Sequence, residues 1–160
     1  MLTTIKLKMY GQTRARYEYV QPTDILLQFL SLKQEHAESL VDYTQRFKQG
    51  KDNLEATIRV QFLSDFIEKT EKYKSGNSGD KQKLKTEAFA EWTAYVYLKN
   101  SDNNKYGMLK KSLQSQYALR NDQYPRTISL TADVMTNHQW DDKYRETDKK
   151  RKENSGGGGS

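Results

Sequence analysis

The sequence has no cysteine, and it has only two histidines and two prolines in 160 residues. Without cysteine, disulfides and zinc sites built on thiolates are both excluded. His36 and His138 lie far apart in the sequence, and neither has a second histidine nearby to complete a zinc set, so we interpret both as surface residues. We therefore expect no metal and no cofactor.

Long apolar runs are also missing. None approaches the length of a membrane span, and no secretory signal precedes residue 30. The sequence has no Gly-rich phosphate loop and no G-x-S-x-G elbow. Its carboxylates mostly stand next to lysines on predicted solvated helix faces, so no general acid/base pair can be singled out. These absences predict a soluble intracellular protein that is not an enzyme, with no membrane and no small-molecule substrate as partner.

Hydrophobic residues make up only 34% of the chain, against 30% charged residues. Eleven Tyr, five Phe and two Trp supply part of the missing core, because each aromatic ring buries a large area. Lys and Arg outnumber Asp and Glu by 27 to 21, and the resulting net charge of +6 favours polyanionic partners. The length suits one domain with a flexible tail.

Apolar residues recur mainly at helical spacing. We expect helices over residues 22–32, 39–47, 52–73, 84–99, 106–120 and 127–135, with a break at Gly50 and exposed turns at 75–83 and 100–104. Pro22 and Pro125 both stand near predicted helix starts, where proline is tolerated. The sequence thus predicts that residues 22–140 form a compact all-α bundle of five or six helices.

The two ends of the chain differ from this middle part. Residues 1–21 alternate weakly, which suits either a short strand or a frayed helix, and their basic-aromatic stretch suits either an RNA-stacking surface or a solvated arm. Residues 141–160 are almost wholly charged before a closing Gly-Ser run, and we expect them to be disordered. The basic run of this tail is a candidate for nucleic-acid contacts: Lys149, Lys150, Arg151 and Lys152.

The segment from Lys33 to Phe47 is the most distinctive stretch. A polar turn leads to Ser39, a good N-cap, and Asp42 follows at the capping-box position. Three apolar side chains then share one helix face, which predicts that they lie in the core: Leu40, Tyr43 and Phe47. Arg46 stands beside that face, where its guanidinium can reach back to Glu38 or Gln34.

The residues of this segment resemble the major homology region of retroviral and retrotransposon capsid proteins, and the matching positions are Gln34, Glu38, Tyr43, Arg46 and Phe47. Glu35 departs from the family, because most retroviral versions have glycine there. The alternative reading of the segment is an ordinary capped helix.

Later segments follow in the order that the resemblance requires. They are Glu91-Trp92, Lys99–Asp102, Met108–Leu113 and Thr127-Ile128. A finer similarity is to the Gag polyproteins of copia-type retrotransposons, carried by Lys105-Tyr106-Gly107, Asn121–Pro125, Thr127, Ala132 and Asn137. Together these segments span residues 23–140, and residues 1–21 would then be at most a remnant of a capsid N-terminal domain.

The resemblance implies a structural capsid-like protein that self-associates into cytoplasmic virus-like particles and packages element RNA. Gln34, Glu38 and Arg46 would form its polar network. Self-association is expected on the helix that carries Trp92, with Phe89 and Val96 beside it, unless Trp92 is simply buried. The chain has neither a zinc knuckle nor a protease signature, which leaves independent shell formation open. The alternative function is a basic helical nucleic-acid-binding or adaptor module without a shell-forming role.

Overall fold

The computed structural model describes residues 19–58 and 63–156, and its described residues contain eight helices and no strand. The helices are α2 (Val20–Ser31), α3 (Leu40–Ile58), α4 (Ser64–Glu68), α5 (Glu71–Lys74), α6 (Lys81–Lys99), α7 (Asn103–Ala118), α8 (Ile128–His138) and α9 (Asp142–Gly156). The prediction of an all-α protein is confirmed. The expectations for residues 1–18 lie outside the described residues.

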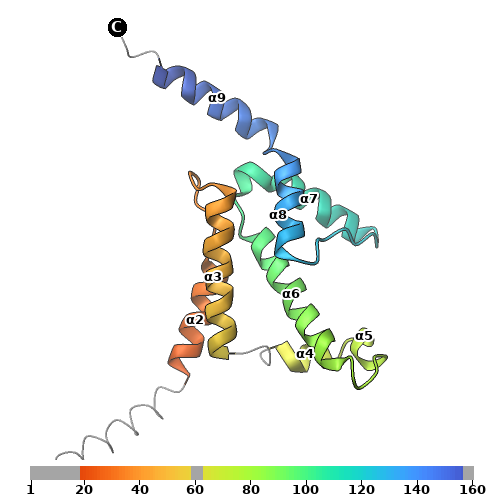
Figure 1. The fold of residues 1–160 in the computed structure, drawn as a ribbon. Coiled ribbons are helices and arrows are strands. Elements are labelled where there is room, and N and C mark those ends of the chain that lie inside the picture. The colour runs from red at the N-terminus through yellow and green to blue at the C-terminus, as the bar shows by residue number, and fades with distance from the viewer. Residues whose placement is uncertain (1–18, 59–62, 157–160) are drawn as a thin grey trace, which may run out of the picture.

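Helices α2 and α3 form one layer, and α6 with α8 forms the next (Figure 1). Helix α8 connects the layers because it packs on α3, α6 and α7. The short helices α4 and α5 lie beside the first half of α6, and α9 extends from the opposite end of the molecule. None of the helices in the described part of the chain is long and apolar enough to cross a membrane.

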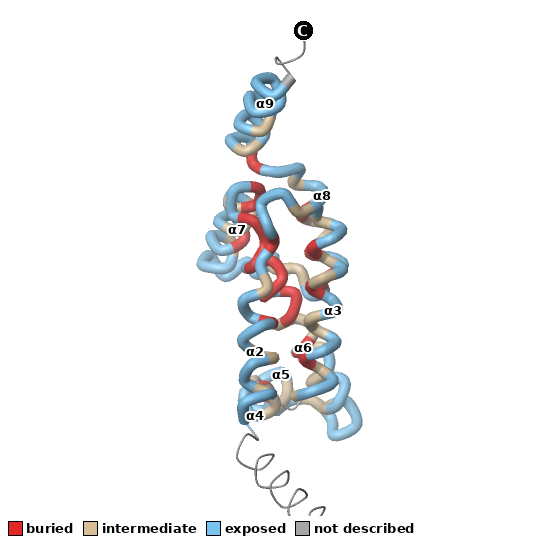
Figure 2. Tube along the Cα trace, turned by 90° about the vertical axis from the view of Figure 1, so that its left-hand side faces the viewer, coloured by how far each residue is buried: buried red, intermediate tan, exposed pale blue. Residues whose placement is uncertain are grey.

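The core lies where α3 meets α6, and it is largely aromatic. The rings of Tyr43 and Tyr97 stack with centroids 4.9 Å apart, and Phe47 meets Tyr97 edge-on at 5.2 Å. Phe29 from α2 continues the cluster, with its ring centroid 5.0 Å from that of Phe47. Figure 2 shows the buried residues gathered along the inside of the layers. Large rings thus compensate for the low share of hydrophobic residues.

The predicted break at Gly50 is wrong, because α3 continues through this residue to Ile58. Glycine usually destabilises a helix interior, but here it permits close packing of α2 on α3. A Cβ atom at Gly50 would lie only 2.8 Å from Cδ1 of Leu32. The glycine therefore marks a helix contact and not a helix end.

The predicted helix over residues 52–73 is also wrong. Helix α3 ends at Ile58, and the short helices α4 and α5 follow after residues 59–62, which lie outside the described part. Thr70 separates the two short helices: its hydroxyl donates to the Ile67 carbonyl and accepts from the Tyr73 amide. A threonine that caps a new helix in this way competes with continuation of the previous one.

For residues 141–160 we expected disorder, whereas the structure places Asp142–Gly156 in helix α9. Charge pairs at helical spacing support it. Lys152 donates to Asp148 at 2.8 Å, and Arg145 pairs with Asp142. Asp141, the first residue of the predicted tail, is buried, and its carboxylate accepts from the Met108 amide of α7 at 3.0 Å. Residues 157–160 lie outside the described residues.

Candidate functional site

The turn before α3 is closed by its own polar groups. Oε2 of Glu38 accepts from the amide of Glu35 at 3.0 Å, and the Glu38 amide donates to the Glu35 carbonyl at 3.1 Å. Ser39 then caps α3 as predicted: its Oγ accepts from the Asp42 amide at 3.1 Å and donates to the Asp42 carboxylate at 2.7 Å. The helix start is thus fixed locally by its sequence.

Arg46 fastens this turn to α3. Its Nε and Nη2 atoms donate to the two carboxylate oxygens of Glu38, each at 2.8 Å, and Nη2 also donates to the Lys33 carbonyl at 2.6 Å. The predicted hydrogen bond from Arg46 back into the turn is confirmed. This bond lowers the pKa of the Glu38 carboxyl, with partial burial acting in the opposite direction. We call residues 33–38, held by Arg46, the clamped turn.

Gln34 connects the clamped turn to a distant corner of the fold. Its side chain is buried, with Oε1 accepting from the amide of Asp102 at 3.0 Å and Nε2 donating to the Glu38 carbonyl at 3.2 Å. Its own amide donates to the Asn100 carbonyl at 2.9 Å. Asn100 in turn donates from Nδ2 to the Leu30 carbonyl at 2.8 Å. The turn between α6 and α7 is therefore a second half of this network.

Sequence reasoning placed the Asn100–Asp102 turn in the family pattern but missed that it binds Gln34. The available signal was the polar character of the two turns, which gives no indication that they meet. The predicted apolar residues behave as expected: Tyr43 and Phe47 are fully buried, and Leu40 packs against the core while remaining partly exposed. The Tyr43 hydroxyl donates to the Tyr97 carbonyl at 2.8 Å, and burial raises its pKa well above the usual value.

The predicted self-association residues need correction. Phe89 and Val96 are only 3% and 7% exposed, so they cannot contact a partner in the folded chain. They are buried because α6 lies against neighbours on several sides, including α4 and α8. Trp92 is partly exposed: its ring centroid lies 5.8 Å from that of Phe29 and 6.0 Å from that of Phe89. Trp92 therefore belongs to both the core and the surface.

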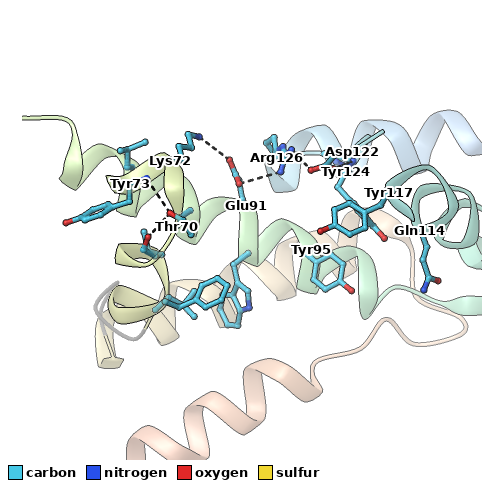
Figure 3. Close-up of a pocket in the computed structure, with 17 residues that line it drawn as sticks. Thr70, Lys72, Tyr73, Glu91, Tyr95, Gln114, Tyr117, Asp122, Tyr124 and Arg126 are labelled. Atoms are coloured by element: carbon cyan, nitrogen blue, oxygen red, sulfur yellow. Dashed lines mark hydrogen bonds and ion pairs between the residues drawn. The ribbon is translucent and has the colours of Figure 1, made fainter. Parts of the chain in front are cut away.

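On its outer side Trp92 borders a cleft of about 860 Å³ between α4, α5, α6 and the segment that joins α7 to α8 (Figure 3). We call it the aromatic cleft. Its lining includes three strongly exposed rings, those of Phe66, Tyr95 and Tyr117. Tyr124 makes edge-to-face contacts with Tyr95 at 5.6 Å and with Tyr117 at 5.9 Å. A row of open rings at one face is typical of a protein contact surface.

The charges along the rim of the aromatic cleft neutralise one another. Glu91 lies 3.9 Å from Lys72 and 3.5 Å from Arg126, and Arg126 also donates to Asp122 at 2.6 Å. Two cations and two carboxylates thus face the same opening (Figure 3). This balanced rim suits an occupant without a large net charge and disfavours a polyphosphate chain.

The candidate nucleic-acid residues all lie on α9 and are exposed: Lys149, Lys150, Arg151 and Lys152. Successive helix positions differ by about 100°, so the four side chains point in different directions and do not form one stripe. Helix α9 carries six basic and four acidic side chains, which leaves an excess of two positive charges. Lys152 is partly neutralised by its pairing with Asp148.

Both histidines pair with aspartates. Nδ1 of the exposed His36 lies 3.3 Å from the carboxylate of Asp102, and Nε2 of His138 lies 2.6 Å from that of Asp141. Within residues 19–58 and 63–156, no group of three or more histidine and acidic side chains could hold a metal ion. Each histidine thus has a local structural partner.

No protein-family model, curated protein or solved structure matches this chain. Its function is therefore argued from three features of the molecule: the clamped turn, the aromatic cleft and the exposed basic side chains of α9.

Proposed function

We propose that this chain is a structural capsid-like protein of the Gag class, similar to those of copia-type retrotransposons. It self-associates through its helical domain into cytoplasmic virus-like particles that package element RNA. It acts as a building block and catalyses no reaction. The observation that supports the proposal best is the clamped turn, in which Arg46, Glu38 and Gln34 hold the start of α3 on the corner between α6 and α7.

The polar network supports an assembling protein because it makes the domain rigid at a defined corner. Glu38 and Gln34 are largely withdrawn from water, and each side chain makes two or more hydrogen bonds inside the protein. A satisfied network of this kind fixes one arrangement of three segments. A lattice requires subunits of constant shape, because every contact is repeated in each copy.

The aromatic cleft supplies a face for self-association. Two copies of a chain with net charge +6 repel each other over most of their surfaces. The cleft is a place where exposed rings are surrounded by a balanced rim, so two copies can meet there with little repulsion. It also contains the outer side of Trp92, the residue for which the family resemblance implies a subunit contact.

Sedimentation velocity over a range of concentrations tests this proposal. We expect the parent chain to form dimers or larger species, and Tyr95→Glu to weaken association at least tenfold, because Tyr95 is 45% exposed in the cleft. Val41→Glu is the matched control: Val41 is 65% exposed on α3, away from the cleft. Trp92→Ala should also weaken association, but it loosens packing on Phe29 and Phe89, so Tyr95→Glu is the cleaner variant.

A parent chain that stays monomeric at the highest attainable concentration would contradict the proposal. Equal weakening by Tyr95→Glu and Val41→Glu would contradict the choice of the cleft. Circular dichroism of each variant shows whether the helices are retained, so that loss of folding is not mistaken for loss of association.

The second candidate function, a basic nucleic-acid-binding module, is favoured by the exposed basic run on α9. Phosphate contacts give an affinity that falls steeply with salt and depends little on base sequence. Changing Lys149, Lys150 and Arg151 to Gln should lower the magnitude of the salt slope for single-stranded RNA by roughly 0.7 for each of these side chains that contacts a phosphate. If binding and its salt slope are unchanged, α9 does not contact the RNA.

A further inference from the structure

Lys105, in the first turn of α7, is a buried lysine at the meeting point of three elements. It is only 4% exposed, although lysine is rarely buried without partners. Its Nζ donates to the carbonyl of Glu38 in the clamped turn at 3.3 Å. The same Nζ lies 5.1 Å from the ring centroid of Trp140 and 5.5 Å from that of Tyr144. One ammonium group therefore bridges the clamped turn and the root of α9.

The aromatic contacts of Lys105 hold the first turn of α9. Trp140 and Tyr144 meet edge-on, with centroids 5.3 Å apart, and both rings attract the cation through their faces. The backbone of Lys105 takes part as well, because its carbonyl accepts from the amide of Asp141 at 2.7 Å. His36 adds a further link from the clamped turn, with its ring 5.3 Å from that of Tyr144.

The corner between α8 and α9 needs such support. Gln139 and Trp140 have φ angles of 61° and 72°, so two successive residues other than glycine occupy the left-handed region. This conformation is disfavoured for side chains with a Cβ atom and persists where neighbouring contacts hold it. Beyond its first turns α9 projects away from the body of the molecule (Figures 1 and 2). Its direction is therefore decided at its root.

We propose that Lys105 sets the direction of α9 relative to the helical bundle, and that the clamped turn acts on this direction through Lys105. We call α9, held in this way, the seated arm. Lys105 is a positioning residue in this device. While it is in place, the exposed basic side chains of α9 extend along one fixed axis. When its contacts are lost, the strained corner relaxes and α9 takes many directions, although the bundle remains folded. This inference goes beyond the proposed function and does not depend on it, since it concerns the monomer.

Distances between two spin labels test the proposal directly, because a chain without cysteine can be labelled at chosen sites. Ser115→Cys on α7 and Asn154→Cys on α9 place the labels at exposed positions. The labelled protein is diluted into an excess of unlabelled protein, so that only distances within one chain are measured. In the parent we expect one narrow distance distribution.

Lys105→Met keeps most of the side-chain volume and removes the charge. We expect it to broaden the distance distribution at least twofold, whereas Lys111→Met, at an exposed position on the same helix, should leave it unchanged. Glu38→Gln should also broaden it, because loss of the pairing with Arg46 loosens the turn that supports Lys105. The helix content and the melting temperature of each variant are measured beside the distances.

A narrow distribution in Lys105→Met would overturn the proposal, as would a broad distribution in the parent. Broadening by Lys105→Met without any by Glu38→Gln would overturn the link to the clamped turn. If Lys105→Met does not fold, Trp140→Leu takes its place, because Trp140 is 37% exposed and its removal spares the bundle core. A narrow distribution in that variant would equally overturn the seated arm.

Discussion

Tyr95 and Tyr97 stand two positions apart on α6 and have opposite environments. Tyr97 is fully buried, stacked on Tyr43, and its hydroxyl lies 2.6 Å from Oγ1 of Thr44. Tyr95 is 45% exposed in the aromatic cleft, where Tyr95, Tyr124 and Tyr117 meet edge-on in a row that we call the open ladder. Nζ of Lys99 also lies 5.9 Å from the centroid of the Tyr95 ring. Two positions on a helix differ by about 200°, so these residues face opposite sides. The same residue type thus builds the core on one side and an open surface on the other.

The buried rings and the exposed rings should therefore have different roles, the first in the stability of the domain and the second in self-association. The buried stack removes whole rings from water and orders them against α3, so it should decide how stable the domain is. Burial also raises the pKa of Tyr97 to about 12, so its hydroxyl stays neutral at any physiological pH. In the open ladder, Tyr95 and Tyr117 are 45% and 60% exposed, so these two rings should add less to stability, and they leave aromatic surface for a partner.

The largest expected effect comes from removing a ring from the buried stack. Tyr43→Ala should lower the free energy of unfolding by about 3–5 kcal/mol, because it leaves a cavity in the core and an unpaired Tyr97 carbonyl. Tyr117→Ala in the open ladder should change it by about 0.5 kcal/mol or less. Urea unfolding at 25 °C measures both. Similar losses from the two substitutions would abolish the distinction between the clusters.

An intermediate effect is expected at the clamped turn. Arg46→Met should lower the free energy of unfolding by about 1–2 kcal/mol at pH 7, a range that allows for the partial exposure of the guanidinium. Arg46 holds the pKa of the Glu38 carboxyl below its unfolded value of about 4.3, so this stabilisation is complete above that pH. It is lost as the pH falls through the folded pKa.

Unfolding measured between pH 7 and pH 3 should therefore show the parent and Arg46→Met converging in stability as the solution becomes acidic. Lys48→Met, at an exposed position on the same helix, is the control and should follow the parent throughout. A gap between the parent and Arg46→Met that stays constant down to pH 3 would mean that the Glu38 carboxylate is not the partner that matters.

The smallest change is the loss of one hydroxyl. Tyr43→Phe should lower the free energy of unfolding by about 1 kcal/mol, because the buried Tyr97 carbonyl loses a donor at 2.8 Å. Tyr95→Phe should have an effect near zero, since an exposed hydroxyl keeps its bonds to water in both states. Thermal unfolding measures the stability of both variants. A larger loss of stability for Tyr95→Phe than for Tyr43→Phe would contradict the assignment of Tyr43 to the core and of Tyr95 to the open surface.

Much of the helical architecture was predictable because capping residues act locally. Ser39 and Thr127 each cap a helix through the amide three residues later, as their sequences indicate. Gly50 was misread because its role lies in a contact with Leu32, which only the packing of two helices creates. The break between α4 and α5 was missed for a related reason: apolar residues recur at helical spacing up to this point, and the capping role of Thr70 appears only in the structure.

The candidate site was predictable only where its parts are close in sequence. Arg46 and Glu38 are eight residues apart, and the polar turn before Ser39 folds back toward the first turns of α3, so a bond between them could be foreseen. Phe89 and Val96 look like surface candidates on a broad apolar helix face, and only tertiary contacts show that both are buried. The aromatic cleft combines residues from α4 to the segment that joins α7 to α8, and no single stretch of the sequence marks it.

The bond between Gln34 and Asp102 also has a consequence for how the chain folds. It joins residues 68 positions apart, so it forms only after a long loop has closed. The pair of α2 and α3 and the pair of α7 and α8 can each form earlier through local contacts. Gln34→Ala should therefore accelerate unfolding and leave the folding rate nearly unchanged, with a φ-value near zero in stopped-flow measurements. The contact between the clamped turn and the Asn100–Asp102 turn would then be the last part of the domain to form.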